Sequence, residues 1–237
     1  MYDKHQVREK PDVVKVTSPV LKSSGERETL AIVSKEVNAF CYMIIGLTGG
    51  IGVGKSFVAN YFKEFGAAVF DADSVVHQLY KVDKSIISYA EKNFPGVVAN
   101  DEIDRTVLSK YFLAYDESWK QFQSLVHSAV LRELEFFIAK EKKIDRKLLV
   151  LDVPLLLETK FYLYCDLIVF VHADSVVQAQ RLNERNIDKE KLNLISDVQL
   201  SIEEKKKMSD FIIDTSVSKE YVFSQVKKIV DSLNLNT

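Results

Sequence analysis

The chain has 237 residues, of which 47% are hydrophobic and 28% are charged, and its formal net charge is −2. This balance argues against a nucleic-acid-binding surface as the main function, and no apolar stretch is long enough to span a membrane. The two cysteines, Cys41 and Cys165, match no metal-binding spacing, so we expect a reduced, cytoplasmic setting.

Residues 1–42 differ from the rest of the chain. They are mixed in charge, carry two of the four prolines and suggest neither a long helix nor a catalytic group. They also lack the apolar core of a signal peptide. We interpret them as an N-terminal extension that is disordered or precedes the true start at Met43, with a small accessory hairpin as the alternative. Residues 43–237 are then the expected functional domain.

A cluster of glycines follows directly. Five of the eight glycines fall within Met43-Ile-Ile-Gly-Leu-Thr-Gly-Gly-Ile-Gly-Val-Gly-Lys-Ser56. From Gly49 onward this segment matches G-x-x-x-x-G-K-[ST], in which backbone amides surround a polyphosphate, the lysine contacts the outer phosphates and the hydroxyl binds Mg²⁺. The predicted ATP-binding residues are Gly50, Ile51, Gly52, Val53, Gly54, Lys55, Ser56 and Phe57, with Ser56 as the metal ligand.

The flanking residues favour this interpretation over a flexible glycine-rich turn, which would need neither Lys55 nor Ser56. The apolar run Ile44–Leu47 predicts a buried strand, and the apolar spacing between Lys55 and Phe65 predicts a helix. Strand, glycine loop and helix is the order that the motif requires, and the helix N-terminus adds a partial positive charge.

A second strand, Ala67–Phe70, is predicted to end at Asp71-Ala-Asp73. In open α/β sheets, ligands bind at the carboxyl edge of the strands. If Asp71 is the last strand residue, Asp73 belongs to the loop and can face the nucleotide, where it could accept or orient the proton of an acceptor hydroxyl. The alternative is that Asp73 caps the next helix. Opposite a phosphate loop, we favour catalysis.

Residues 74–143 are predicted to be mostly helical, with a break at residues 93–96 and a polar connection through Asp104. A long apolar stripe at helical spacing extends from Phe122 to Ile138. His127 lies in this stripe, where a satisfied core histidine is the usual outcome.

Three further strands, at Leu148–Val153, Leu167–Val171 and Phe211–Ile213, are predicted before a last helix from Lys219 to Leu233. Strands that alternate with helices imply a parallel sheet covered on both faces. Asp152 closes the first of these strands, and two roles stay open for it: a contact to Mg²⁺ through water, or a bond to the backbone.

A charged segment lies between the last two strands. Arg181 and Arg185 share one helical face there and could fold over the triphosphate and neutralise the transferring group; the alternative is a solvated surface helix. The lysine run Lys205–Lys207 is predicted to be a solvated face.

Taken together, four segments resemble the dephospho-CoA kinase family. They are Thr48-Gly-Gly-Ile-Gly-Val-Gly-Lys-Ser56, Asp71-Ala-Asp73, Leu125-Val-His127 and Val153-Pro-Leu-Leu-Leu-Glu158, and the resemblance extends from Met43 to about Asp231. The phosphate loop is shared by many families, whereas the second and fourth segments at these spacings are far more specific. The resemblance implies that ATP phosphorylates the ribose 3′-hydroxyl of dephospho-CoA, giving CoA and ADP.

The resemblance also implies an α/β fold: a three-layer P-loop kinase core with a five-stranded parallel sheet, a helical acceptor-binding insertion at about 79–142 and a small lid at about 178–205. Asp73 matches the family's proposed catalytic base, with Lys55 and Arg181 beside it. Arg185 matches the second lid arginine, on ATP. The implied substrate-binding residues are Asp73, His127, Pro154, Leu155 and Glu158.

Three positions depart from the family pattern. Ser128 stands where proline is usual, Phe57 replaces a common threonine, and Thr215-Ser216-Val217 stands where asparagine-serine-glycine is typical. The last departure bears on the adenine contacts expected from Asp210 to Ser216, and not on the phosphate chemistry.

The nearest alternative is another small-molecule or nucleoside-monophosphate kinase of the same fold, which the acceptor-side segments argue against. A GTP-dependent switch would carry Asn-Lys-x-Asp and Asp-x-x-Gly sequences, and this chain has neither. We therefore expect ATP and Mg²⁺ as cofactors and dephospho-CoA as the small-molecule partner. We expect no nucleic-acid or membrane partner, and a monomer or weak homo-oligomer.

Overall fold

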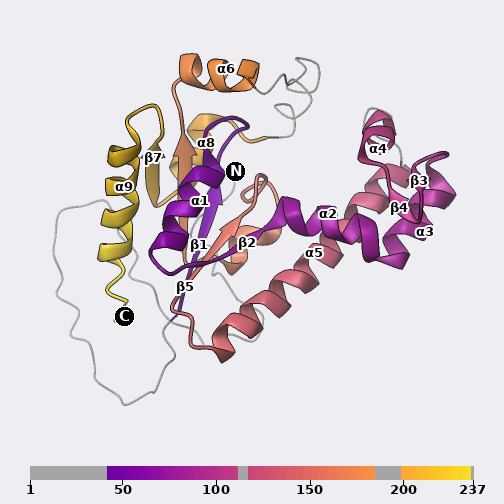
Figure 1. Cartoon of the computed structure of the whole chain (residues 1–237), viewed down its shortest axis with the longest axis horizontal. Coiled ribbons are helices and arrows are strands. Elements are labelled where there is room, and N and C mark those ends of the chain that lie inside the picture. Colours follow the sequence, from indigo (N-terminus) through magenta and orange to yellow (C-terminus); the bar gives the residue numbers. More distant parts are fainter. Residues whose placement is uncertain (1–41, 112–116, 185–198, 236–237) are drawn as a thin grey trace.

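A five-stranded parallel sheet lies at the centre of the computed structural model, which describes residues 42–111, 117–184 and 199–235. Its strand order is β2-β5-β1-β6-β7, and every neighbouring pair is parallel (Figure 1). The strands are β1 (Met43–Thr48), β2 (Ala68–Asp71), β5 (Leu148–Asp152), β6 (Leu167–His172) and β7 (Phe211–Asp214). The parallel sheet and its five strands are as predicted.

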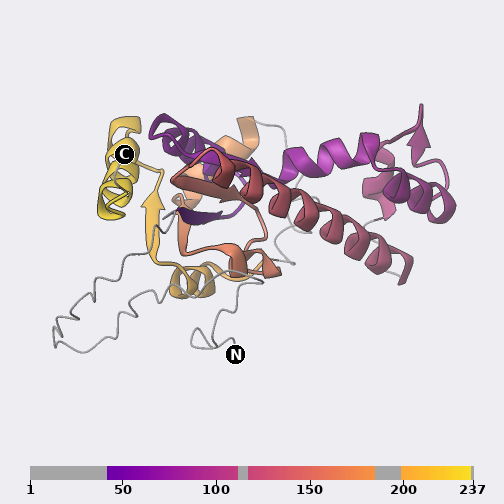
Figure 2. The ribbon, with the colours of Figure 1, turned by 90° about the horizontal axis from the view of Figure 1, so that it is seen from below.

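Helices cover both faces of this sheet, as the near-continuous apolar strands require. Helices α1 (Lys55–Glu64) and α9 (Lys219–Ser232) pack on one face with Leu148 and Val150 of β5. Helix α5 (Glu117–Lys143) and the 3-10 helix η1 (Lys160–Tyr164) pack on the other face with Leu149 and Leu151. The neighbouring side chains of β5 thus alternate between two cores, and the molecule has three layers (Figure 2).

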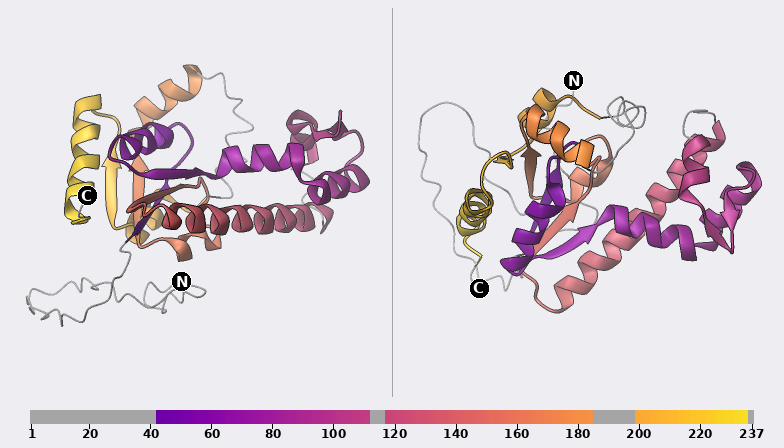
Figure 3. Two further views of the ribbon diagram at one scale, coloured as in Figure 1. Left: turned by 60° about the horizontal axis from the view of Figure 1, so that its bottom comes forward. Right: turned by 45° about the horizontal axis from the view of Figure 1, so that its top comes forward.

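A helical lobe extends away from the sheet. Helix α2 (Ala72–Val82) runs beside α5 and leads into α3 (Lys84–Asn93) and α4 (Arg105–Tyr111) (Figure 3). Phe94, Trp119 and Phe122 pack against one another at its centre. The lobe begins at Ala72, a few residues before the predicted acceptor insertion at about 79–142, whose role stays a proposal.

The lobe also contains an antiparallel hairpin, β3 (Val98–Ala99) with β4 (Glu102–Ile103), that the sequence analysis did not predict. Asn100 and Asp101 form its turn at φ values of 53° and 61°. Positive φ at both turn positions suits a tight two-residue hairpin, and Asn and Asp tolerate it better than most residues.

The last part of the chain returns to the sheet. Helix α6 (Ser175–Glu184) follows β6, and α8 (Ile202–Met208) precedes β7 and packs against β6. Ser201 caps α8 through a reciprocal pair of bonds with Glu204. In the part of the chain that the structure describes, no helix is both long and apolar enough to cross a membrane.

Candidate active site

The carboxyl ends of three strands meet at one edge of the sheet. In the strand register Asp71 pairs with Asp152, and Asp152 in turn pairs with Leu47, one residue before the end of β1. The phosphate loop leaves β1 at this edge. Two carboxylates and the loop are therefore brought together by strand pairing alone.

The phosphate loop has the backbone shape that its glycines predict. Gly54 precedes α1 at φ 87°, a left-handed conformation that glycine adopts without strain, and no side chain caps the helix there. At Gly49, a Cβ atom would lie 2.6 Å from the carbonyl oxygen of Val171. The N-terminus of α1 thus presents amides without a capping side chain, which suits a phosphate group.

Phe57, predicted to bind the nucleotide, uses both its amide and its side chain inside the protein. Its N–H donates to the carbonyl of Gly54 over 3.1 Å, and its ring packs edge-on against Tyr61 with 4.6 Å between centroids. The threonine that is common in the family could place a hydroxyl near the nucleotide, whereas this ring belongs to the layer between α1 and α9.

Lys55 forms an ion pair with Asp152. The ammonium group donates to one carboxylate oxygen, and the two side chains are only 12% and 6% exposed. The sequence left two roles open for Asp152, a contact to Mg²⁺ through water or a bond to the backbone. The contact seen here is neither of these, because the partner is the lysine. The aspartate holds the lysine at the carboxyl edge of the sheet.

The described residues offer Mg²⁺ few ligands of their own. They contain no cluster of three or more histidine, cysteine or acidic side chains that could hold a metal. Ser56 is exposed in the first turn of α1, beside the loop. A hydroxyl together with nucleotide phosphates and waters is a common Mg²⁺ environment, so these residues fit a metal that arrives with the nucleotide.

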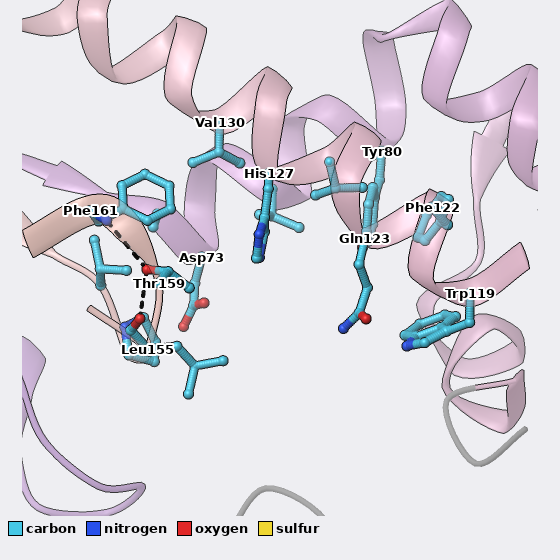
Figure 4. A pocket seen from close by; sticks show the side chains of 15 residues that line it. Asp73, Tyr80, Trp119, Phe122, Gln123, His127, Val130, Leu155, Thr159 and Phe161 are labelled. Atoms are coloured by element: carbon cyan, nitrogen blue, oxygen red, sulfur yellow. Dashed lines mark hydrogen bonds between the residues drawn. The ribbon is translucent and has the colours of Figure 1, made fainter. Parts of the chain in front are cut away.

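Asp73 lies in a helix and not in a loop as predicted. Helix α2 begins at Ala72, because Asp71 caps it by accepting hydrogen bonds from the Ser74 amide over 3.1 Å and the Ser74 hydroxyl over 2.8 Å. The capping role considered for Asp73 thus belongs to Asp71. The Asp73 carboxylate instead lines the neighbouring pocket (Figure 4).

The surroundings of Asp73 raise its pKa above the ordinary value. Desolvation by the pocket walls is the main cause, although part of the side chain reaches solvent. The carboxylates of Asp71 and Asp152 raise the pKa further, while the positive charges of Lys55 and Arg105 oppose the shift. Of the three carboxyl groups at this edge, Asp73 is the one that lines the pocket, and a displaced pKa beside a pocket is typical of a functional group.

The pocket next to Asp73 is a largely apolar cavity of about 240 Å³ between α2, α5 and the loop after β5. Figure 4 shows Asp73 near one end and Trp119 at the other. Pro154 and Leu155, both predicted to bind the acceptor, line it. The lining also includes four aromatic and two polar residues that the sequence analysis did not assign to the site. They are Tyr80, Trp119, Phe122, Phe161, Gln123 and Thr159.

His127 faces this pocket, so the expectation of a core histidine is wrong. Its ring is exposed into the cavity and lies edge-on to Phe161, with 6.5 Å between centroids. Desolvation by the surrounding side chains lowers the pKa of His127. The imidazole is therefore neutral at physiological pH and can offer a hydrogen bond without a charge.

Glu158 does not line the pocket, unlike its predicted partners in the same segment. One of its carboxylate oxygens accepts hydrogen bonds from Lys205 Nζ and from the Leu200 amide, each over 2.9 Å. The Lys205 side chain is only 2% exposed. The prediction of a solvated lysine face is therefore wrong at Lys205.

Arg181 extends from α6 to the phosphate loop and is not a solvated surface residue. Its guanidinium donates to the hydroxyl of Thr215 over 2.9 Å and to the Thr215 carbonyl over 2.7 Å. The hydroxyl of Thr215 donates over 2.6 Å to the carbonyl of Val53 within the loop. Arg185, the second predicted arginine, lies outside the described residues.

A second residue of α6 also bonds to the loop. Gln178 donates from its amide to the carbonyl of Ile51 over 2.7 Å. Gln178 was not predicted as part of the site, since an isolated glutamine carries no motif. Thr215 lies in the segment expected to approach the adenine, but its bonds to Arg181 and Val53 were not predicted. The one available signal was the departure from the family pattern at Thr215.

Comparison with known proteins agrees with this geometry. The family model described as dephospho-CoA kinase matches residues 43–220. A dephospho-CoA kinase of Wolbachia pipientis wMel is 95% identical over 195 residues, covering 82% of this chain and 100% of that protein. One of Ehrlichia canis (strain Jake) is 42% identical over 195 residues, covering 82% and 96%.

Solved structures share the fold. The structure of TT1252 from Thermus thermophilus has a TM-score of 0.71 at 24% identity, covering 83% of this chain and 100% of that one. Dephospho-CoA kinase from Campylobacter jejuni has a TM-score of 0.60 at 18% identity, covering 80% and 96%. With the family match over most of its length and these close relatives, this chain belongs to the dephospho-CoA kinase family.

Proposed function

We propose that the carboxyl edge of the sheet is where this kinase transfers the γ-phosphate of ATP to the ribose 3′-hydroxyl of dephospho-CoA. The observation that carries the proposal is the position of Asp73. Its carboxylate lines an apolar pocket suited to an organic acceptor and is electrostatically coupled to Lys55 of the phosphate loop. Asp73 thus lies where a phosphate bound by the loop and an acceptor hydroxyl bound in the pocket would meet for phosphoryl transfer.

The nucleotide side consists of the loop amides, Lys55 and Ser56. The amides at the start of α1 bind the phosphate oxygens, and Lys55 balances the charge of the transferring group. Its partner Asp152 keeps the lysine at the edge of the sheet before the nucleotide arrives. Mg²⁺, held by the phosphates and the Ser56 hydroxyl, would supply further charge neutralisation.

Arg181 is proposed to act from above the loop. In the structure its guanidinium is engaged by Thr215, next to Gly54. From this position a small movement of α6 would bring its charge onto the nucleotide. Arg185 is proposed to follow it in the lid at about 178–205.

The acceptor side consists of Asp73, His127, Pro154 and Leu155. Asp73 accepts the proton of the attacking hydroxyl or orients that hydroxyl in line with the phosphate. The neutral imidazole of His127 supplies a polar contact on an otherwise apolar wall. Glu158 does not line the pocket, and one of its carboxylate oxygens accepts hydrogen bonds from Lys205 and the Leu200 amide.

An acceptor panel tests the function. The purified chain is offered ATP and Mg²⁺ with dephospho-CoA, AMP, GMP, CMP or shikimate in parallel. We expect turnover with dephospho-CoA alone and a product carrying a ribose 3′-phosphate in the ³¹P spectrum. Phosphorylation of another acceptor without turnover of dephospho-CoA would refute the proposal.

The substitution Asp73→Asn tests the role of the carboxylate. Removing a general base typically slows the chemical step about 10²–10⁴-fold, so we expect kcat to fall by this amount while ATP still binds in a calorimetric titration. Asp71→Asn is the matched control, since asparagine still caps α2. Unchanged turnover in Asp73→Asn would remove the assigned role.

The remaining expectations concern the enzyme's setting. We propose that it acts in the cytoplasm, binds no nucleic acid and is a monomer or weak homo-oligomer. Sedimentation at working concentration, with and without ATP, measures the last of these.

A further inference from the structure

A buried ion pair lies behind the acceptor pocket, outside the residues given a chemical role. Glu158 belongs to the loop after β5, and Lys205 belongs to α8; their side chains are 10% and 2% exposed. One carboxylate oxygen of Glu158 accepts both the lysine and the Leu200 amide, each over 2.9 Å. The other is buried and has no hydrogen-bond partner among the described residues.

The surroundings of the pair come close to the phosphate loop. Lys205 also donates to the side-chain oxygen of Gln199 over 3.4 Å. That oxygen is 3.9 Å from the point that a Cβ on Gly50 would occupy. Gly50 precedes Ile51, whose carbonyl Gln178 holds. Hydrogen bonds therefore join the acceptor loop to Lys205 and Gln199, and Gln199 lies beside the phosphate loop.

A buried ion pair such as Glu158–Lys205 contributes little to the stability of the fold. Removing two charges from water costs free energy that the attraction within a buried pair only partly repays, and an apolar pair of the same volume is often as stable. A buried oxygen without a partner adds to that cost. The arrangement does fix the relative position of two segments, because a buried charge has one place where it is satisfied.

The fixed segment matters for the acceptor. Four residues before Glu158, the loop begins with Pro154 and Leu155, which form one wall of the pocket. Thr159, next to Glu158, donates over 2.7 Å to the carbonyl of Leu155 and passes any displacement of Glu158 to that wall. Movement of the ion pair therefore moves the wall that faces Asp73.

We propose that Glu158 and Lys205 are positioning residues for the transfer, which hold the acceptor-pocket wall in register with the phosphate loop. The inference rests on the proposed placing of dephospho-CoA in this pocket. It assigns Glu158 an indirect role in acceptor binding and gives Lys205, which carries no motif, a role in the same function.

Two variants test the proposal. Lys205→Met leaves a buried carboxylate without its cation, and Glu158→Gln/Lys205→Met removes both charges. We expect the melting temperature to fall in the single variant and to recover in the double variant. The KM for dephospho-CoA should rise at least ten-fold in both, with the KM for ATP changed less than three-fold. Lys227→Met, which breaks the exposed Lys227–Asp231 pair of α9, is the control and should change neither KM.

The outcomes separate a positioning role from a structural one. If the double variant regains both its melting temperature and the wild-type KM for dephospho-CoA, the pair only stabilises the fold and the proposal is wrong. The same holds if Lys205→Met melts early but has the wild-type KM. Failure of the proposed function itself would appear differently, as absence of dephospho-CoA turnover by the wild-type chain.

Discussion

Four charged side chains lie together at the carboxyl edge of the sheet: Lys55, Asp71, Asp73 and Asp152. Lys55 pairs with Asp152, whereas Asp73 lies nearby without a hydrogen-bonded cation in the described structure. Both carboxylate oxygens of Asp71 accept hydrogen bonds from Ser74 that cap α2. The three carboxylates therefore have different roles. Asp152 holds Lys55, Asp71 caps α2, and Asp73 stays available to a substrate.

This division predicts a pH effect of Asp71→Asn. The Asp71 charge raises the pKa of Asp73, so its removal should lower that pKa and keep Asp73 ionised to lower pH. Since kcat/KM reports the free enzyme, its acid limb should move to lower pH, with little change near neutrality. The pH profile of kcat/KM for dephospho-CoA measures this shift.

Asp83→Asn is the control for that experiment, because Asp83 caps α3 in the same way within the lobe. It should leave the acid limb in place. An acid limb that stays fixed in Asp71→Asn, or that moves equally in both variants, would contradict the electrostatic coupling.

Thr215 carries a second prediction at this scale. Its hydroxyl joins Arg181 to the carbonyl of Val53, so Thr215→Val leaves both groups without this partner. A lost hydrogen bond of this kind costs about 1–3 kcal/mol, and the loop would lose order that nucleotide binding must restore. We expect the KM for ATP to rise roughly five-fold or more.

Thr215→Ser retains the hydroxyl and should behave like the wild type, which separates the hydrogen bond from the packing of the side chain. An unchanged KM for ATP in Thr215→Val would show that Arg181 and the loop need no such link. Motif reasoning placed Thr215 near the adenine but could not predict this link, because the two partners lie 34 and 162 positions away.

At the scale of elements, apolar patterning predicted strands and helices well, whereas the turns and the start of a helix were predicted poorly. The five strands of the sheet and the helices α1 and α9 have apolar spacings that follow their periods, and they were predicted within a few residues. The hairpin at residues 98–103 was missed because two-residue strands show no periodicity. The start of α2 was misplaced because the cap at Asp71 lies inside what appeared as a strand end.

Gly46 illustrates a requirement that strand patterning cannot reveal. It lies in β1 with an ordinary backbone, yet a Cβ there would be 2.5 Å from Leu156 and 2.6 Å from the sulfur of Cys165. Gly46→Ala should therefore overpack the core and destabilise the fold by about 1–3 kcal/mol. Thermal unfolding measures the effect, with the exposed Ser128→Ala as control; equal melting temperatures would contradict the close approach.

At the scale of the whole molecule, the sequence predicted the fold class but not the pocket between α2, α5 and the loop after β5. The sheet order and the angle at which α5 leaves the sheet depend on long-range packing. These determine that Val126, His127 and Val130 of this helix line a cavity, where the histidine is exposed and the two valines are largely covered. A helical stripe shows which face is apolar, but not that a neighbouring loop leaves part of it open.

The junction between residues 1–42 and the core gives the last prediction. The described fold begins where the Met43 amide donates to the Lys147 carbonyl over 2.8 Å. Upstream of it, the described structure contains only Tyr42, whose ring lies 4.2 Å below the Lys142 ammonium. Removal of Tyr42 takes away this cation–π contact, worth about 0.5–1 kcal/mol at an exposed site, and the packing of its partly buried ring against the core.

A chain that starts at Met43 should therefore melt only about 1–4 °C lower, with kcat and both KM values within two-fold of the full chain. A second truncation that starts at residue 47 removes most of the central strand and should not fold. Because β1 carries the phosphate loop and pairs with both β5 and β6, the chain should lose its ability to fold when its start moves from residue 43 to residue 47. A folded Met43 chain with ten-fold weaker activity would instead place residues 1–42 in the working enzyme.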